Sequence, residues 1–162
     1  MVIGLLRKEI FDVQIDKEFY EKFLNFFREE IEKIFGHDMA LVSSENNFSY
    51  RGFFMLSYTF LPLNYNIIIE NEFRAFGIMI EDSEGASSCL NRMAVFDNAL
   101  DRQNIENAIQ ILKEVLEKNN FNFYFSIDNK LYRKNSHGVK RLKDMKELLN
   151  EYEEYICSSE QT

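Results

Sequence analysis

The architecture of this chain is set by residues 66–81, whose sequence is NIIIENEFRAFGIMIE. The run Ile67–Ile69 predicts a strand over Asn66–Glu70 that is buried on both faces. Asn71 and Glu72 predict a tight connection, and the chain then returns from Phe73 to Glu81 with apolar residues at alternate positions. Two strands joined by so short a connection pair antiparallel.

The alternation of apolar and polar residues that is typical of strands also extends from these two strands back to Met39. We expect a short strand over Met39–Ser43, a turn at Glu45–Asn47 and an aromatic-rich strand over Phe48–Leu61. Gly52 marks a bulge or bend within the aromatic-rich strand, and residues 62–65 break the chain before the next one. Residues 39–82 therefore predict an antiparallel meander of four strands.

Two helices enclose this meander in sequence. The first is expected over Lys17–Phe35, with Asp16 as its N-cap and Gly36 directly after its last turn. The second is expected over Arg102–Lys118, capped by Asp101. Each shows an apolar stripe at helical spacing, made of Phe19, Phe23, Phe27, Ile31 and Ile34 in the first and of Ile105, Ala108, Ile109, Leu112, Val115 and Leu116 in the second.

A hairpin and a third helix complete the pattern. Phe121–Ile127 alternates strictly, Asp128-Asn129 is a hairpin turn signal, and Leu131–Arg133 returns. The last helix is expected over Val139–Ile156. Its core face is predicted to carry Leu142, Met145, Leu149, Tyr152 and Ile156.

The order of elements predicts an α+β fold in one domain, residues 1–162. We expect a single antiparallel sheet of about five to six strands flanked by three helices, in the order α-ββββ-α-ββ-α. Residues 82–88 are the clearest loop, and residues 89–96 fit a short strand or a helical turn. The pattern leaves residues 1–15 open, as a sheet edge, a swapped arm or nothing regular.

Composition limits the function classes. The 162 residues carry 27 acidic and 19 basic side chains, a formal charge of −8, which disfavours a binder of nucleic acid that relies on phosphate contacts. No apolar stretch is long enough for a membrane span, and no secretory signal is evident. The two cysteines, Cys89 and Cys157, are expected to be reduced thiols, so the default is a cytoplasmic protein.

The sequence offers no motif for catalysis. It has no nucleophile elbow, zinc-protease motif or glycine-rich phosphate loop, so we predict no enzyme activity, no metal and no cofactor. His37 and His137 each adjoin a glycine and are interpreted as exposed turn residues. Two alternatives stay open: Cys89 as a reactive thiol, and an enzyme whose site has no recognisable motif.

Acidic residues are the candidate binding residues. Glu81, Asp82 and Glu84 crowd the longest loop, and Asp97 and Asp101 follow shortly after it. Loops carry many binding residues and charge complementarity speeds association, so we predict these five acids to bind a basic partner protein. The plain alternative is an acidic surface that only confers solubility.

A basic cluster lies at the predicted hairpin and at the start of the last helix. The interpretation favoured is a solvated surface, with an acidic partner protein as the alternative. Its members are Lys130, Arg133, Lys134, Lys140, Arg141, Lys143 and Lys146.

An acidic α+β chain of this size resembles the immunity proteins of bacterial polymorphic-toxin and contact-dependent inhibition systems. The helix and Phe-rich hairpin over Asn104–Lys134 carry this resemblance. It implies a protein that binds one cognate toxin, often a basic nuclease domain, and blocks it stoichiometrically. The element order is also similar to class I chaperones of type III secretion, which implies a homodimer holding an effector segment. The sequence leaves monomer and homodimer open.

Overall fold

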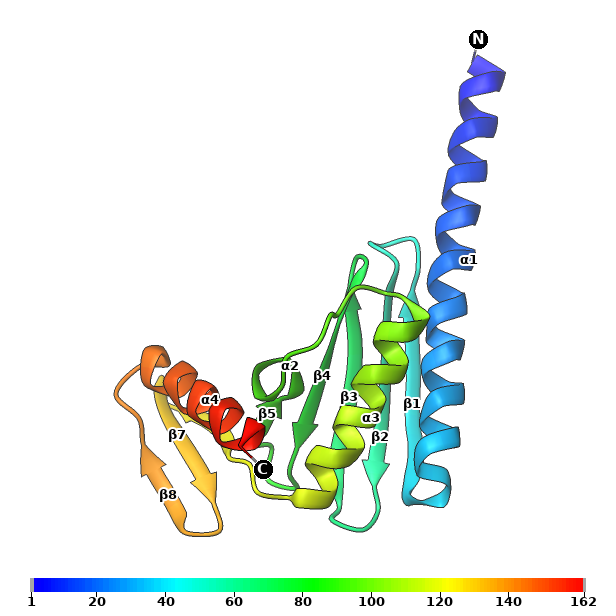
Figure 1. The fold of residues 1–162 in the computed structure, drawn as a ribbon. Helices are drawn as coiled ribbons and strands as arrows, with labels where there is room; N and C mark the ends of the chain where they lie inside the picture. The colour runs from blue at the N-terminus through cyan, green and yellow to red at the C-terminus, as the bar shows by residue number, and fades with distance from the viewer. Residues whose placement is uncertain (1, 162) are drawn as a thin grey trace.

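The structure is a computed structural model, and it describes the backbone of residues 2–161 and the side chains of residues 16–161. Within this range the chain forms one antiparallel sheet whose eight strands follow one another in sequence order, with four α-helices (Figure 1). The strands are β1 (Met39–Asn47), β2 (Phe53–Phe60), β3 (Tyr65–Glu72), β4 (Ala75–Glu81), β5 (Ser87–Cys89), β6 (Phe123–Ile127), β7 (Lys130–Asn135) and β8 (Gly138–Arg141). The helices are α1 (Val2–Phe35), α2 (Leu90–Met93), α3 (Arg102–Lys118) and α4 (Met145–Glu160), and a 3₁₀ turn covers Gly36–Asp38.

The predicted α+β class and single antiparallel sheet are confirmed. The expected number of five to six strands is wrong, because β5 and β8 are short strands of three and four residues that carry little alternation. The expected three helices become four, because α2 is a single turn of four residues. None of the helices within the described residues is long and apolar enough to cross a membrane.

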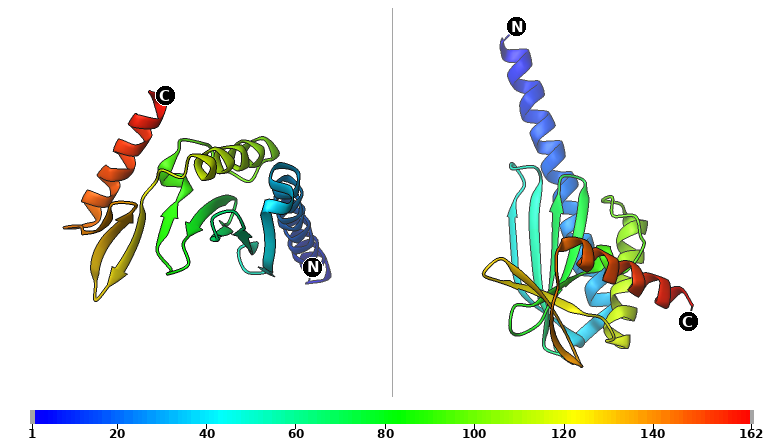
Figure 2. Two further views of the ribbon diagram at one scale, coloured as in Figure 1. Left: turned by 90° about the horizontal axis from the view of Figure 1, so that it is seen from below. Right: turned by 90° about the vertical axis from the view of Figure 1, so that its left-hand side faces the viewer.

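The core lies between one face of β2–β4 and helices α1 and α3. Residues alternate along each strand between a buried side, which faces these helices, and a half-buried or exposed side. Phe27 of α1 is fully buried, and its ring packs against the rings of Phe54 on β2 and Phe76 on β4. Burying one such side chain stabilises the fold by about 2–3 kcal/mol. Figure 2 shows α1 and α3 on the same side of the curved sheet.

Helix α1 is longer than predicted. It begins at Val2, so Asp16 lies inside the helix and is not its N-cap. Residues 2–15, which the sequence left open as part of a sheet edge, a swapped arm or nothing regular, are helical and continuous with the segment packed on the sheet. This helix projects well beyond the end of the sheet (Figure 1). Helix α3, by contrast, has the predicted bounds and cap, and its six predicted core residues are all buried.

The turns of the meander lie a few residues away from their predicted places. Residues 45–47 belong to β1, and the turn falls at 48–52, where Gly52 has φ +67° and is not a bulge. Asn71 and Glu72 belong to β3, and the chain reverses at Phe73, which has φ +52°. The polar composition of residues 45–47 and 71–72 predicted turns at both places. Strand pairing nevertheless continues through both segments, which keep a regular antiparallel register with β2 and β4 respectively.

The C-terminal helix also starts later than predicted. Val139 belongs to β8 and pairs with Lys134 of β7. Helix α4 begins only after Asp144, whose carboxylate accepts a hydrogen bond from the amide of Glu147. Met145 is consequently exposed and is not a core residue, whereas Tyr152 is buried as predicted. The triplet Ile67–Ile69 is also not buried on both faces, because Ile68 is only half-buried on the side of the sheet away from α1 and α3.

Candidate binding face

The five predicted acids do not form one surface. Leu100 donates its amide hydrogen to the carbonyl oxygen of Arg74, and Ala99 pairs with Ala75, so the segment with Asp97 lies at the beginning of β4. Glu81 is the last residue of the same strand. A strand of seven residues spans about 20 Å, which separates Asp97 and Asp101 from Glu81, Asp82 and Glu84 (Figure 1).

Asp82 has a structural role. Its carboxylate is buried, accepts hydrogen bonds from the amides of Glu84 and Ala86, and lies 2.9 Å from Nζ of Lys134. Burial alone would raise the pKa of this carboxyl group, but the hydrogen bonds from Lys134 and from the two amides outweigh it and hold the pKa below its ordinary value. Such a group shapes the loop and is poorly placed to meet a partner.

Three of the other predicted acids also have partners within the chain. Asp101 is the N-cap of α3, and Asp97 accepts a hydrogen bond from the amide of Ala99. Glu84 is exposed and forms an ion pair with Lys134. Both aspartates shape the local backbone, as N-caps and Asx turns do.

Glu81 has a different environment. It pairs with Asn66 across β3 and β4 and lies on the side of the sheet that α1 and α3 leave uncovered. We call this side of β1–β5 the open face. The register of the strands adds Glu45, Glu70 and Glu72 to the same side. These three acids were not among the predicted binding residues.

The centre of the open face is apolar. Met55, Ile68 and Met79 are half-buried there, and Ile68 pairs directly with Met79 across β3 and β4. The acids stand around them, since Glu70 pairs with Met55 on one side and with Gly77 on the other. An apolar centre with a polar border is the usual anatomy of a protein-binding surface.

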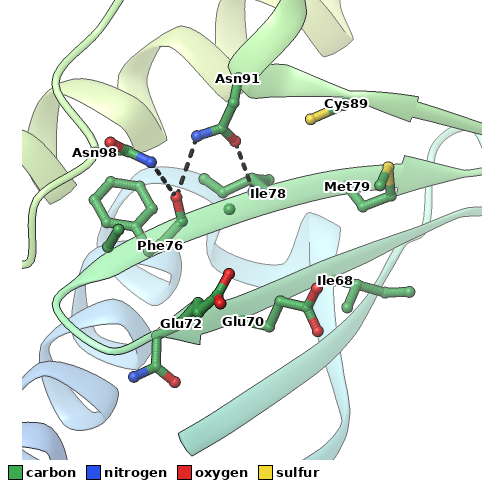
Figure 3. A pocket seen from close by; sticks show the side chains of 12 residues that line it. Ile68, Glu70, Glu72, Phe76, Ile78, Met79, Cys89, Asn91 and Asn98 are labelled. Atoms are coloured by element: carbon green, nitrogen blue, oxygen red, sulfur yellow. Dashed lines mark hydrogen bonds between the residues drawn. The ribbon is translucent and has the colours of Figure 1, made fainter. Parts of the chain in front are cut away.

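A hollow of about 300 Å³ lies in this face above Gly77. Figure 3 shows its lining, with the carboxylates of Glu70 and Glu72 on β3 and Met79 and Cys89 from β4 and β5. Asn91 closes one side by donating to the carbonyl oxygen of Phe76 and accepting from the amide of Ile78. Strand β5 pairs only with the last three residues of β4. Asn91 therefore supplies hydrogen-bond partners for backbone groups of β4 that β5 does not reach.

No cation neutralises the acids of the open face within the described residues. Between Met39 and Cys89 the sequence contains two basic side chains, Arg51 and Arg74, and both lie in turns. Arg74 lies over the ring of Phe19, and Arg51 lies over the ring of Phe73. This scarcity of basic residues over fifty positions is the sequence signal that would have identified the face.

A second exposed feature lies at the turns that end β1 and β3. Tyr50 and Phe73 are exposed by 60% and 50%, and the guanidinium of Arg51 lies over both rings, 5.5 Å from the centroid of Tyr50 and 5.0 Å from that of Phe73. The buried Asn71 holds both turns, because its side chain bonds the amide of Phe54 and the carbonyl oxygens of Gly52 and Phe73. Exposed, fixed Tyr, Arg and Phe side chains favour a protein contact at this end.

A larger cavity of about 560 Å³ lies at the other end of the sheet. Asp82, Lys134 and His137 line it together with several asparagine side chains. Asp82 and Lys134 already form an ion pair with one another. Within the part of the chain whose side chains are described, no group of three or more His, Cys, Asp or Glu side chains is placed to hold a metal ion. The basic cluster is partly engaged, since three of its seven members, Arg133, Lys134 and Lys140, form ion pairs with acids of the chain.

No known family model, curated protein or solved structure matches the chain. Its possible chemistry therefore follows from its own residues. The open face combines uncompensated carboxylates with half-buried apolar side chains, an arrangement suited to contact with a basic protein surface.

Proposed function

We propose that this chain is an immunity protein that binds a basic toxin domain and neutralises it in a stoichiometric complex. The resemblance of the sequence to such proteins supports the proposal. The formal charge of −8 supports it too, because an acidic protein attracts a basic partner and associates with it faster.

The observation that carries the proposal is the charge of the open face. Glu45, Glu70, Glu72 and Glu81 share this face with no cation paired to them among the described residues. Four like charges on one sheet face do not help folding, because they repel one another. They do help a complex in which a basic partner neutralises them. The same contact removes the apolar centre from water, and this burial stabilises the complex further.

The test is co-expression with the toxic domain encoded by the adjacent gene. We expect the wild-type chain to protect growth and to elute with that domain at 1:1 by light scattering. The double variant Glu70→Lys with Glu72→Lys should abolish protection, while a matched reversal, Glu114→Lys on the exposed side of α3, should leave it unchanged. Equal protection by both variants would remove the open face from the complex.

The alternative, a homodimeric secretion chaperone, draws on a different observation. About the first half of α1 extends past the sheet (Figure 1), and an isolated helical segment of that length is only marginally stable in water. A second copy of the chain would stabilise it. A dimeric mass for the free protein, together with retention of an unfolded secreted segment, would favour this alternative over toxin neutralisation.

A further inference from the structure

The hollow in the open face exists because residue 77 is glycine. A Cβ atom built at Gly77 would meet only Oδ1 of Asn91, 3.8 Å away, so the space above it is open. The backbone of Gly77 is outside the left-handed region, so its conformation does not require glycine. The missing side chain therefore matters for the space that it leaves in the centre of β4.

The walls of this hollow differ in chemistry. Ile68 and Met79 supply an apolar side, and Glu70 and Glu72 supply two carboxylates from alternate positions of β3 (Figure 3). Side chains two residues apart on one strand face are separated by about 7 Å, so one extended group with several donors can reach both. No other described side chain donates to either carboxylate.

We infer that this hollow receives an arginine side chain of the partner protein. The identification of that partner as a toxin rests on the proposed function, but the chemistry of the hollow does not. The methylene groups of arginine would cover Ile68 and Met79, while its guanidinium would reach Glu70 and Glu72. A planar group with five donors suits two carboxylates better than the single ammonium of lysine does.

The inference is tested with a small probe, N-acetyl-arginine amide, added to the isotopically labelled full chain and followed by amide NMR. We expect saturable shifts centred on Gly77, Met79 and Glu70. The matched citrulline amide, which has the same shape without the charge, should bind roughly tenfold more weakly. Equal shifts with citrulline, or shifts spread over the whole acidic surface, would overturn the inference.

Two variants locate the probe. Gly77→Val fills the hollow with a residue that suits a strand, and Glu72→Gln removes one charge at constant size. Both should reduce arginine-amide affinity at least roughly fivefold, whereas Glu114→Gln on α3 should not change it. If Gly77→Val does not fold, the affinity of Glu72→Gln for the arginine amide still tests whether the probe binds in the hollow. Unchanged binding in Glu72→Gln would contradict the inference, and stronger binding of lysine amide would reassign the occupant to lysine.

The outcomes separate the two proposals. Binding of the arginine probe without any neutralised toxin would sustain the hollow as an arginine site and reject the immunity function. Toxin neutralisation that survives Gly77→Val and Glu72→Gln unchanged would sustain the immunity function and reject the arginine site.

Discussion

The Nζ atom of Lys134 lies 2.9 Å from Oδ2 of Asp82, and this ion pair joins β7 to the loop between β4 and β5. Near this point the sheet ladder is weak, because β5 and β6 share a single residue pair, Ser87 with Tyr124. The loop itself is ordered by the same carboxylate, which accepts the amide of Ala86. Asp82 therefore connects the two halves of the sheet.

Replacing this charge should weaken the fold. Asp82→Asn keeps the shape and one acceptor for the loop amides but loses the ion pair with Lys134, and we expect a loss of about 1–2 kcal/mol in the free energy of unfolding at pH 7. Urea titration monitored by circular dichroism measures it. The matched control is Glu84→Gln, where an exposed partner of the same lysine is neutralised and the loss should stay below about 0.5 kcal/mol.

The same pair predicts a pH dependence. The pKa of Asp82 is lowered in the folded state, so its contribution is complete above its ordinary value of 3.8 and is lost as the pH falls through the folded pKa. The stability difference between wild type and Asp82→Asn should therefore be constant from pH 7 to about 5 and should shrink towards pH 3. A difference that grows on acidification would show that the carboxylate is not held in its charged form.

Some elements could be predicted residue by residue. Helix α3 has a capping aspartate, a stripe of six apolar residues and Asn119 in the left-handed conformation directly after its last turn. All three signals are local, and they agree with one another, so the bounds follow from the sequence. The Asp128-Asn129 turn is equally local, and both residues have positive φ as a tight hairpin requires.

Other features depend on contacts that the sequence does not display. Phe73 reverses the chain in a left-handed conformation because Asn71, in the adjoining strand, bonds its carbonyl oxygen. Asp82 was predicted to face a partner, but a lysine 52 residues later in the chain binds it. Glu70 and Glu72 share a face by the local periodicity of β3 alone, but the position of Glu45 and Glu81 beside them depends on the register of β1–β4, which local periodicity does not give.

Asn71 should be the most sensitive polar residue of the meander. Asn71→Ala removes three hydrogen bonds and leaves the amide of Phe54 buried without its partner. We expect a loss of about 2–4 kcal/mol in the free energy of unfolding, measured by urea titration. Asn66→Ala, at an exposed position of the same strand, should change it by less than about 0.5 kcal/mol, and a similar effect of both variants would refute the bracing role of Asn71.

Gly52 should tolerate no side chain. A Cβ atom there would lie 2.1 Å from the ring of the buried Tyr20, and φ is +67°. We expect Gly52→Ala to cost about 2–4 kcal/mol by thermal or urea unfolding, since a steric clash adds to backbone strain. Gly36→Ala is the matched control, because φ is +54° there but no atom lies within 4 Å, so only the strain of about 1 kcal/mol remains. The clash also predicts that Gly52→Ala costs less in a Tyr20→Leu background.

Alkaline pH should unfold the protein through its buried tyrosines. Burial raises the pKa of Tyr58 to about 12, with a smaller upward contribution from Glu32 and an opposing one from Arg28. A tyrosine in the unfolded chain loses its proton near pH 10, so the unfolded state binds fewer protons than the folded state and stability falls between pH 10 and 12. Burial raises the pKa values of Tyr124, Tyr152 and Tyr155 in the same direction.

Tyr58→Phe isolates one of these groups. This substitution removes only the hydroxyl group, which is the group that ionises. The variant should therefore lose less stability than wild type between pH 10 and 12, as measured by urea midpoints alongside tyrosinate absorbance. The exposed Tyr50 supplies the control: its side chain is largely in solvent in both states, so Tyr50→Phe should give a profile parallel to that of wild type. If the profile of Tyr58→Phe were also parallel to that of wild type, the phenol of Tyr58 would be able to ionise without unfolding, and the packing of β2 against α1 would be looser than the structure describes.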